Sequence, residues 1–349
     1  MPIACTSFRC LLLACTFLTG GCLTRGPASI AEQRGPYTEV LSATDKEELL
    51  ANIVRLAYLD APVFLQVSSV TAAPSFEYGG EVDVGLGDGG RPSPLVLAKP
   101  KVLAKDSPTI VYKPLLGKEF AGELLMPFDI RPVFLMLDNG FDFSVVAQLL
   151  FKSMNNLSNS RTATSAEREA FRRVTDAMGR LLHKGDVRVG TTTEGLGATG
   201  GRVLVTLRPE AALAGDGAFV LKELGLDPKL ASFELKSGLV GDAGSIAVAT
   251  RSLLALLSYM ANYVEAPADH AAMVVPSDAL RDTHPLMRVH SSVKQPDRGD
   301  PAVFYKGYWF YIAADDLRSR NTLFLIRLLF NLQAQSSGGD PVQLTLPVR

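Results

Sequence analysis

The sequence predicts an α+β fold in which helices pack on a mainly antiparallel sheet, behind an N-terminal export segment. Helical and strand-like segments alternate irregularly, without the regular β-α-β succession that builds a parallel sheet. Two pairs of strand-like segments, 187–192 with 202–207 and 303–305 with 308–312, are separated by glycine-containing stretches. Such pairs are typical of hairpins, whose strands are antiparallel.

The first helix of the body is expected at 44–58. Thr44 and Glu47 have the spacing of a capping box, and apolar residues follow at helical intervals until Pro62 ends the pattern. A strand at 63–70, a glycine-rich turn or mobile loop at 78–91 and a strand at 109–112 come next. Short helices are then expected at 117–125, 130–138 and 143–155.

The clearest amphipathic helix is expected at 165–183, with Ser165 as its cap and Gly185 as its end. Further along the chain we expect a strand at 232–236, a buried helix at 250–264 and a strand at 288–293. The hairpin of 303–312 follows, with Lys306-Gly307 as its two-residue loop, and a final helix is expected at 315–333.

The composition describes a globular chain without a charge bias. Hydrophobic residues make up 47% of the chain and charged residues 20%, a balance that excludes intrinsic disorder of the whole. Lys and Arg total 35 against 36 Asp and Glu. Because no basic excess favours nucleic acid, we expect no nucleic-acid partner.

All four cysteines lie within the first 22 residues, at Cys5, Cys10, Cys15 and Cys22. Cleavage just before Cys22 would leave a single cysteine at the new N-terminus, which suits an oxidising compartment. Cysteine-based zinc clusters, thiol nucleophiles and structural disulfides are then excluded from the folded body.

Residues 1–21 have the pattern of a bacterial lipoprotein signal peptide. The apolar run 10–18 has the length of a signal core and is too short to span a bilayer. Gly20 and Gly21 before Cys22 resemble the lipobox of lipoprotein signal peptidase, although Thr19 departs from the commoner leucine. We therefore predict cleavage there and attachment of palmitate-type lipid at Cys22. Ordinary secretory cleavage, or an N-terminal helix packed in a cytosolic core, are the alternatives.

The expected address is the outer membrane. Leu23 stands where an aspartate would resemble an inner-membrane retention signal, so we expect an anchor on the periplasmic face. Residues 22–36, with two Gly-Pro pairs, are expected to form the lipidated cysteine and a flexible tether. Residues 37–349 then form a single globular body, with a possible subdivision near 156–165.

Metal and nucleotide motifs are incomplete in the body. The glycine stretches 85–90 and 195–201 lack the pattern of a nucleotide-binding loop. The histidines lack metal-ligand spacing, and Asp269-His270 or Asp282-x-His284 with Asp278 nearby supply part of a site at most. We expect no metal and no cofactor.

A nucleophilic catalytic set is also incomplete. The sequence has no G-x-S-x-G elbow. His290 and Ser292 share a face of a predicted strand, which permits a hydroxyl–imidazole contact, but a strand with a polar side toward solvent is the favoured interpretation. We therefore name no catalytic residue.

An aromatic hairpin marks the C-terminal third. Alternation places Tyr308 and Phe310 on one face of its second strand, and Trp309 and Tyr311 on the other. Aromatic residues on both faces indicate either a strand covered twice or a platform exposed on one side, and core packing is the favoured alternative. An exposed platform would make a binding surface, and its candidate residues are Tyr308, Trp309, Phe310, Tyr311, His290 and Ser292.

Segments 49–70, 108–127, 250–267, 288–292 and 305–334 together resemble an uncharacterised family of Gram-negative bacterial lipoproteins. The resemblance covers nearly all of the chain behind the signal peptide. It implies a periplasm-facing lipoprotein with one continuous body, and it implies no activity, ligand or catalytic residue.

The sequence therefore favours a lipid-anchored envelope protein with a non-catalytic binding or structural role. Its expected partners are the membrane, through the N-terminal lipid, and an envelope protein. The alternative is a periplasmic hydrolase acting on a cell-wall or carbohydrate substrate, which requires a polar cleft near His284, His290 or Ser292.

Overall fold

The structure is a computed structural model that describes residues 25–71, 74–84, 96–106, 109–114, 118–130, 136–137, 140–191, 202–282 and 284–335. Its architecture is α+β with mainly antiparallel strand pairs, which confirms the predicted fold class. The predicted signal peptide, Cys22 and the two glycine stretches 85–90 and 195–201 lie outside the described residues.

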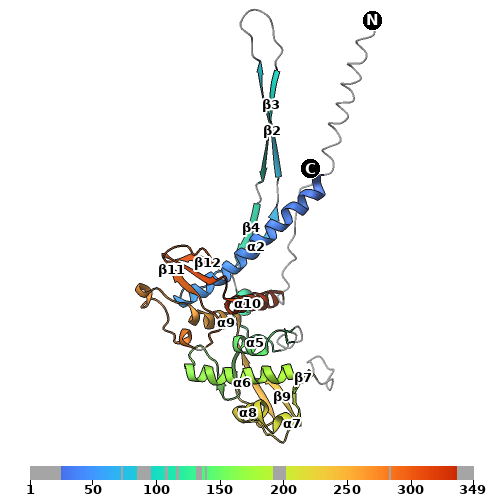
Figure 1. Cartoon of the computed structure of the whole chain (residues 1–349), viewed down its shortest axis with the longest axis vertical. Helices are drawn as coiled ribbons and strands as arrows, with labels where there is room; N and C mark the ends of the chain where they lie inside the picture. The colour runs from blue at the N-terminus through green and yellow to red at the C-terminus, as the bar shows by residue number, and fades with distance from the viewer. Residues whose placement is uncertain are drawn as a thin grey trace, which may run out of the picture.

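A six-stranded sheet forms one end of the body (Figure 1). Its strands are β5 (Phe151–Met154), β6 (Leu157–Ser158), β7 (Val187–Thr191), β8 (Val203–Leu207), β9 (Ser232–Ser237) and β10 (Ser245–Thr250). Their order is β6-β5-β10-β9-β8-β7, with β9 and β10 parallel and the other neighbours antiparallel. The predicted hairpin of β7 and β8 is confirmed, whereas β10 was not predicted.

Helix α6 (Ser165–Lys184) packs beside this sheet and contacts α5 (Phe143–Leu150) and α8 (Gly215–Leu224). The predicted helix is confirmed, but its cap is Thr164 and not Ser165. The Thr164 hydroxyl accepts from the Glu167 N–H at 3.3 Å, and the Glu167 carboxylate accepts from the Thr164 N–H at 2.8 Å, a complete capping box. Gly185 ends the helix as predicted, with a φ of 72° that favours glycine.

A three-stranded antiparallel sheet contains the aromatic hairpin. It consists of β11 (His290–Ser292), β12 (Gly299–Tyr305) and β13 (Tyr308–Ala313), in the order β11-β13-β12. The two-residue loop is confirmed. Lys306 and Gly307 have φ angles of 45° and 88°, and two positive φ angles are what a tight type I′ hairpin loop requires.

Helix α2 (Arg25–Ala57) begins earlier than predicted. Residues 25–36 are helical, so the predicted flexible tether is wrong for them. Pro27 lies in the first turn, where its missing N–H costs nothing, and Pro36 removes one hydrogen bond from a helix of 33 residues. The predicted cap at Thr44 is wrong too, because Thr44 lies inside the helix and donates to the carbonyl three residues earlier at 3.0 Å.

An antiparallel ribbon projects from the body (Figure 1). Strand β1 (Leu65–Thr71) pairs with β4 (Thr109–Pro114), and β2 (Pro74–Val84) pairs with β3 (Val96–Asp106). The pairings of Thr71 with Thr109 and of Pro74 with Asp106 belong to one register. The loop predicted at 78–91 is wrong for 78–84, because glycines in a strand weaken a ladder without breaking it.

The remaining helices are α3 (Lys118–Leu125), α7 (Pro209–Ala212), α9 (Leu253–Met260) and α10 (Leu317–Gln335), with short 3₁₀ turns η1 (Ala261–Tyr263), η2 (Ala268–His270) and η3 (Ala279–Arg281). Helices α3, α9 and α10 confirm predicted helices. The helix predicted at 143–155 is wrong beyond Leu150, where β5 begins. Residues 136–137 are helical, and the rest of the helix predicted at 130–138 lies largely outside the described residues.

The buried apolar side chains form one cluster from Leu49 in α2 to Leu329 in α10. Helices α9 and α10 lie between the two sheets, and the C-terminal part of α2 contacts both helices (Figure 1). Phe64 after α2 stacks on Phe330 of α10 with ring centroids 5.5 Å apart. Within the part of the chain that the structure describes, no helix is long and apolar enough to cross a membrane.

Arg251 closes the junction between the helices and the six-stranded sheet. The residue is 2% exposed, and its guanidinium donates to the carbonyls of Gln148, Leu149 and Phe151 at 3.0, 2.7 and 2.9 Å, and also to that of Asn159. The first two carbonyls belong to the last turn of α5, which has no intrahelical donors for them and carries the negative end of the helix dipole. Arg251 therefore caps α5 from inside the core.

Replacing Arg251 by methionine is expected to lower the free energy of unfolding by about 3–5 kcal/mol, because several buried carbonyls lose their donor. Urea denaturation measures the loss. The matched control is Arg188→Met on the exposed side of β7, which should change stability by less than about 0.5 kcal/mol. Equal denaturation midpoints for the two variants would contradict the capping role.

Candidate functional site

The inward face of the three-stranded sheet packs on the C-terminal end of α2. The ring of Tyr58, just after that helix, lies 6.1 Å from the Phe310 ring and 5.6 Å from the Tyr305 ring. Phe310 is 0% exposed, so it lies outside the binding surface that the sequence suggested. Tyr308 shares this face and is half-buried. The sequence favoured core packing for the aromatic hairpin, and this holds for the inward face, which carries Tyr308 and Phe310, but not for the outward face.

The outward face collects the other aromatic residues. The register places Phe304 and Ser292 on either side of Trp309, and His290 beside Tyr311. Phe304 is 60% exposed and its ring lies 5.5 Å from that of Trp309. The structure thus brings together four of the six candidate residues, Trp309, Tyr311, His290 and Ser292, on what we call the aromatic face.

One residue of the aromatic face, Phe304, was missing from the candidates named from the sequence. Phe304 lies opposite Trp309 as soon as the hairpin loop has two residues, so the alternation that placed Trp309 was sufficient to find it. Trp309 and Tyr311 are half-buried, which leaves an apolar surface formed by rigid strands.

The loop end of the hairpin is clamped to α2. The Lys306 ammonium lies 2.8 Å from the Asp60 carboxylate and 5.0 Å from the centre of the Tyr58 ring. Tyr305 donates to the same Asp60 carboxylate. The Tyr58 hydroxyl lies 2.7 Å from Nδ1 of His270, which adds the η2 turn to the clamp. These contacts fix the orientation of the aromatic face relative to α2.

We call these contacts between the hairpin loop, the end of α2 and His270 the clamp. Burial and neighbouring charged groups shift the pKa values of three of its residues, Tyr58, Asp60 and Tyr305. Burial, and next the negative charge of Asp269, raises the pKa of Tyr58 to about 12. Burial, together with the hydrogen bond to Asp60, raises the pKa of Tyr305 to about 12. Hydrogen bonds from Lys306 and Tyr305 lower the pKa of the Asp60 carboxyl. Both hydroxyls therefore stay protonated at neutral pH and keep their partners.

His290 lines a polar cleft of about 490 Å³ together with His284 and Ser319. Its Nδ1 lies 2.8 Å from the Glu265 carboxylate. The hydroxyl–imidazole contact that strand alternation permitted is not made, because Ser292 donates to the Lys294 carbonyl at 2.5 Å. The hydroxyl of Ser319 donates to Asp316, also at 2.5 Å. The cleft therefore contains the imidazole of His290, paired with Glu265, but neither Ser292 nor Ser319 donates its hydroxyl hydrogen to that imidazole.

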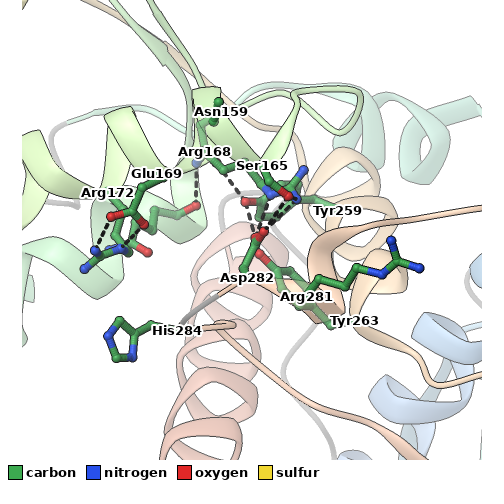
Figure 2. A pocket seen from close by; sticks show the side chains of 12 residues that line it. Asn159, Ser165, Arg168, Glu169, Arg172, Tyr259, Tyr263, Arg281, Asp282 and His284 are labelled. Atoms are coloured by element: carbon green, nitrogen blue, oxygen red, sulfur yellow. Dashed lines mark hydrogen bonds and ion pairs between the residues drawn. The ribbon is translucent and has the colours of Figure 1, made fainter.

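A second polar cavity, of about 300 Å³, lies between α6 and the segment that follows η3 (Figure 2). Arg168 of α6 holds Asp282 with two hydrogen bonds, at 2.6 and 2.8 Å, and holds Asp278 at 2.8 Å. The hydrogen bond from Arg168 lowers the pKa of the Asp278 carboxyl. His284 stands apart from this cluster in Figure 2. The cavity is polar, and the positive charge of Arg168 is paired with the negative charges of Asp278 and Asp282.

The floor of the same cavity is a hydrogen-bonded chain. Tyr263 donates to the Tyr259 hydroxyl at 3.3 Å, Tyr259 donates to the Asn159 side-chain oxygen at 2.7 Å, and the Asn159 amide donates to backbone carbonyls. Burial raises the pKa of Tyr263 well above its usual value, so its hydroxyl stays neutral. Arg251 stacks below, 3.8 Å from the centre of the Tyr259 ring. We interpret this cavity as a structural joint.

Four of the five residues considered as partial metal ligands have other partners. Asp278 and Asp282 bind Arg168, Asp269 accepts from Tyr308 at 2.9 Å, and His270 contacts Tyr58. Across the described ranges, no group of three or more His, Cys, Asp or Glu residues could hold a metal ion.

Comparison with known proteins adds no neighbour: no family model, no curated protein and no solved structure matches the chain. The resemblance to the lipoprotein family therefore stays a prediction.

The clamp predicts a loss of stability at high pH. Free tyrosine has a pKa of 10.0, so between that value and about 12 the unfolded chain releases protons that Tyr58 and Tyr305 retain in the folded protein. The free energy of unfolding should therefore fall as the pH rises through this range. Urea denaturation at stepped pH values measures the slope.

Tyr58→Phe should reduce that alkaline slope, and Tyr58→Phe combined with Tyr305→Phe should reduce it further. At neutral pH the single variant should lose about 1 kcal/mol through the missing contact with His270. An alkaline slope identical in the wild type and the double variant would contradict this assignment.

Proposed function

We propose that the protein is a lipid-anchored component of the cell envelope that binds a partner protein without catalysing a reaction. The observation that carries the proposal is the aromatic face. Phe304 is 60% exposed beside a half-buried Trp309 and Tyr311, on strands whose opposite face is packed in the core. Exposed aromatic residues on a rigid support are typical of the centres of protein interfaces.

The surroundings of the aromatic face fit a protein partner. Lys294 and Lys306 are exposed at its border and supply the polar rim that surrounds most interface centres. The clamp at Asp60 removes freedom from the hairpin before binding, so less conformational entropy is lost on association. Trp309 and Tyr311 are also side chains that contribute strongly where they become fully desolvated.

The anchor is supported by the position of α2. The helix starts at Arg25, three residues after Cys22, and runs for 33 residues into the core. At about 1.5 Å per residue the helix is about 50 Å long. A lipid on Cys22 would thus be followed almost directly by a helical stalk, which holds the aromatic face away from the bilayer on the periplasmic side of an outer membrane.

The alternative of a periplasmic hydrolase has one observation in its favour, the pairing of His290 with Glu265 beside a polar cleft. We favour the binding role, because the hydroxyls of Ser292 and Ser319 donate to Lys294 and Asp316 instead of to the imidazole.

The anchor is tested by metabolic labelling with radioactive palmitate. The wild-type chain should incorporate label and sediment with the outer membrane, because a diacylated and N-acylated cysteine anchors effectively irreversibly. The Cys22→Ser variant should lose the label. Equal labelling of the two chains, or of neither, would remove the anchor from the proposal.

Partner binding is tested by a photo-crosslinking amino acid placed at Phe304 in the full-length chain, in intact cells. We expect an adduct whose mass exceeds that of the chain by the mass of a different protein. Trp309→Ser in the same chain should abolish it, because the centre of the interface is lost.

The matched control places the same crosslinker at Leu213, which is 83% exposed on the far side of the body near α7. An identical adduct pattern at Leu213 and Phe304, or no adduct at Phe304, would reject the aromatic face as a binding surface.

A further inference from the structure

The outer half of the ribbon has two faces of opposite character. Neighbouring positions of a strand belong to opposite faces, and positions paired across the ladder share one. The first face carries Phe76, Tyr78, Gly80, Val82 and Val84 on β2, and Val96, Ala98, Pro100, Val102 and Ala104 on β3. The charged positions of the second face are Glu77, Glu81 and Asp83 on β2, and Lys99, Lys101 and Lys105 on β3.

Charge is also divided between the two strands. Strand β2 contains acidic residues and no basic ones, whereas the basic residues are all on β3, which has a single acid at its end, Asp106. The two long edges of the ribbon therefore have opposite charge. A ribbon built in this way is complementary to a copy of itself placed edge to edge.

Edge-to-edge pairing continues the pattern already present within one ribbon. When β2 of a second copy lies antiparallel beside β3 of the first in this register, Lys99 and Glu81, the one directly opposed pair of charges in the ladder, are opposite each other again. Apolar positions are likewise beside apolar positions on the other face. Opposite-charge cross-strand pairs stabilise a sheet, and like-charge pairs would destabilise it.

The isolated ribbon has a physical need for such a neighbour. A two-stranded ladder is marginally stable by itself, and each strand leaves one edge of backbone N–H and C=O groups without a strand partner. Strands β2 and β3 form a two-stranded sheet, and Figure 1 shows them standing clear of the described body. The described body therefore supplies no third strand.

We propose that the ribbon is the site of self-association, in which β3 of one copy pairs antiparallel with β2 of the next copy of this chain. The α2 stalk extends toward the same end of the molecule as the ribbon (Figure 1). Copies standing side by side would thus hold their ribbons alongside one another. This assembly goes beyond the proposed partner binding and uses no residue of the aromatic face.

The experiment is disulfide crosslinking of full-length chains in intact cells. Two differently tagged copies are co-produced, one with Glu81→Cys and the other with Lys99→Cys. The chain has no cysteine after Cys22, so the new thiols are the sole ones in the body. Opposite positions in an antiparallel pair have Cβ atoms about 4.5–5.5 Å apart, close to disulfide distance. We expect a disulfide dimer with both tags, and none when Leu213→Cys replaces either partner.

A charge-swapped chain tests specificity while keeping each ribbon complementary within itself. It carries Glu77→Lys, Glu81→Lys and Asp83→Lys on β2, and Lys99→Glu, Lys101→Glu and Lys105→Glu on β3. In each tagged copy the cysteine takes the place of the charge swap at its own position, 81 or 99. Swapped copies should crosslink to each other, which also shows that the swapped ribbon folds. Swapped and wild-type copies should crosslink less, because position 77 of one copy then lies diagonally between positions 101 and 105 of the other with the same charge.

Three results would overturn the proposal. One is the absence of the dimer between wild-type Glu81→Cys and Lys99→Cys copies. Another is crosslinking of wild-type to swapped copies as efficient as that of matched copies. The third is a dimer formed by Val82→Cys alone in place of the Glu81–Lys99 dimer, which would indicate packing of apolar faces. The palmitate and Phe304 experiments are unaffected by any of these results.

Discussion

The buried guanidinium of Arg251 is the interaction on which the body depends. It binds the carbonyls at the C-terminal end of α5, where the chain changes from helix to β5, and it supports the Tyr259 ring beneath the polar cavity. Burying a charge without partners is costly, so this arginine is stable only because its donors have backbone carbonyls to bind. The position of α5 follows, and with it the packing of α6 on the sheet.

The same rule, that a buried polar group must have a partner, explains the clamp at the other sheet. Tyr58, Tyr305 and Lys306 each place a polar end among aromatic rings, and each end is satisfied by Asp60 or His270. With one face of the sheet fixed in this way, the aromatic residues of the opposite face have no core left to enter. Phe304 is therefore exposed because it lies on the face opposite to the one that buries Phe310.

Binding and self-association use separate parts of the molecule. The aromatic face belongs to the sheet packed on the C-terminal end of α2, whereas the ribbon projects from the body toward the other end of that helix (Figure 1). The two surfaces also differ in physical character, since one presents aromatic rings on a buttressed sheet and the other presents backbone edges with opposite charges. One assembly could thus form without blocking the other.

The sequence by itself determined the fold class, helix α6, the tight hairpin loop and the alternation of the aromatic residues, because these depend on neighbours within a few positions. The cap of α6 could also be read from the sequence, because Thr164 and Glu167 have the spacing of a capping box, whereas Ser165 has Arg168 three residues later. The sequence did not reveal that Arg251 caps α5, that Asp278 and Asp282 bind Arg168 instead of a metal, or which face of the aromatic hairpin is covered. Those outcomes join residues as many as 245 positions apart, as in the contact of Tyr305 with Asp60, and the tertiary structure alone brings such residues together.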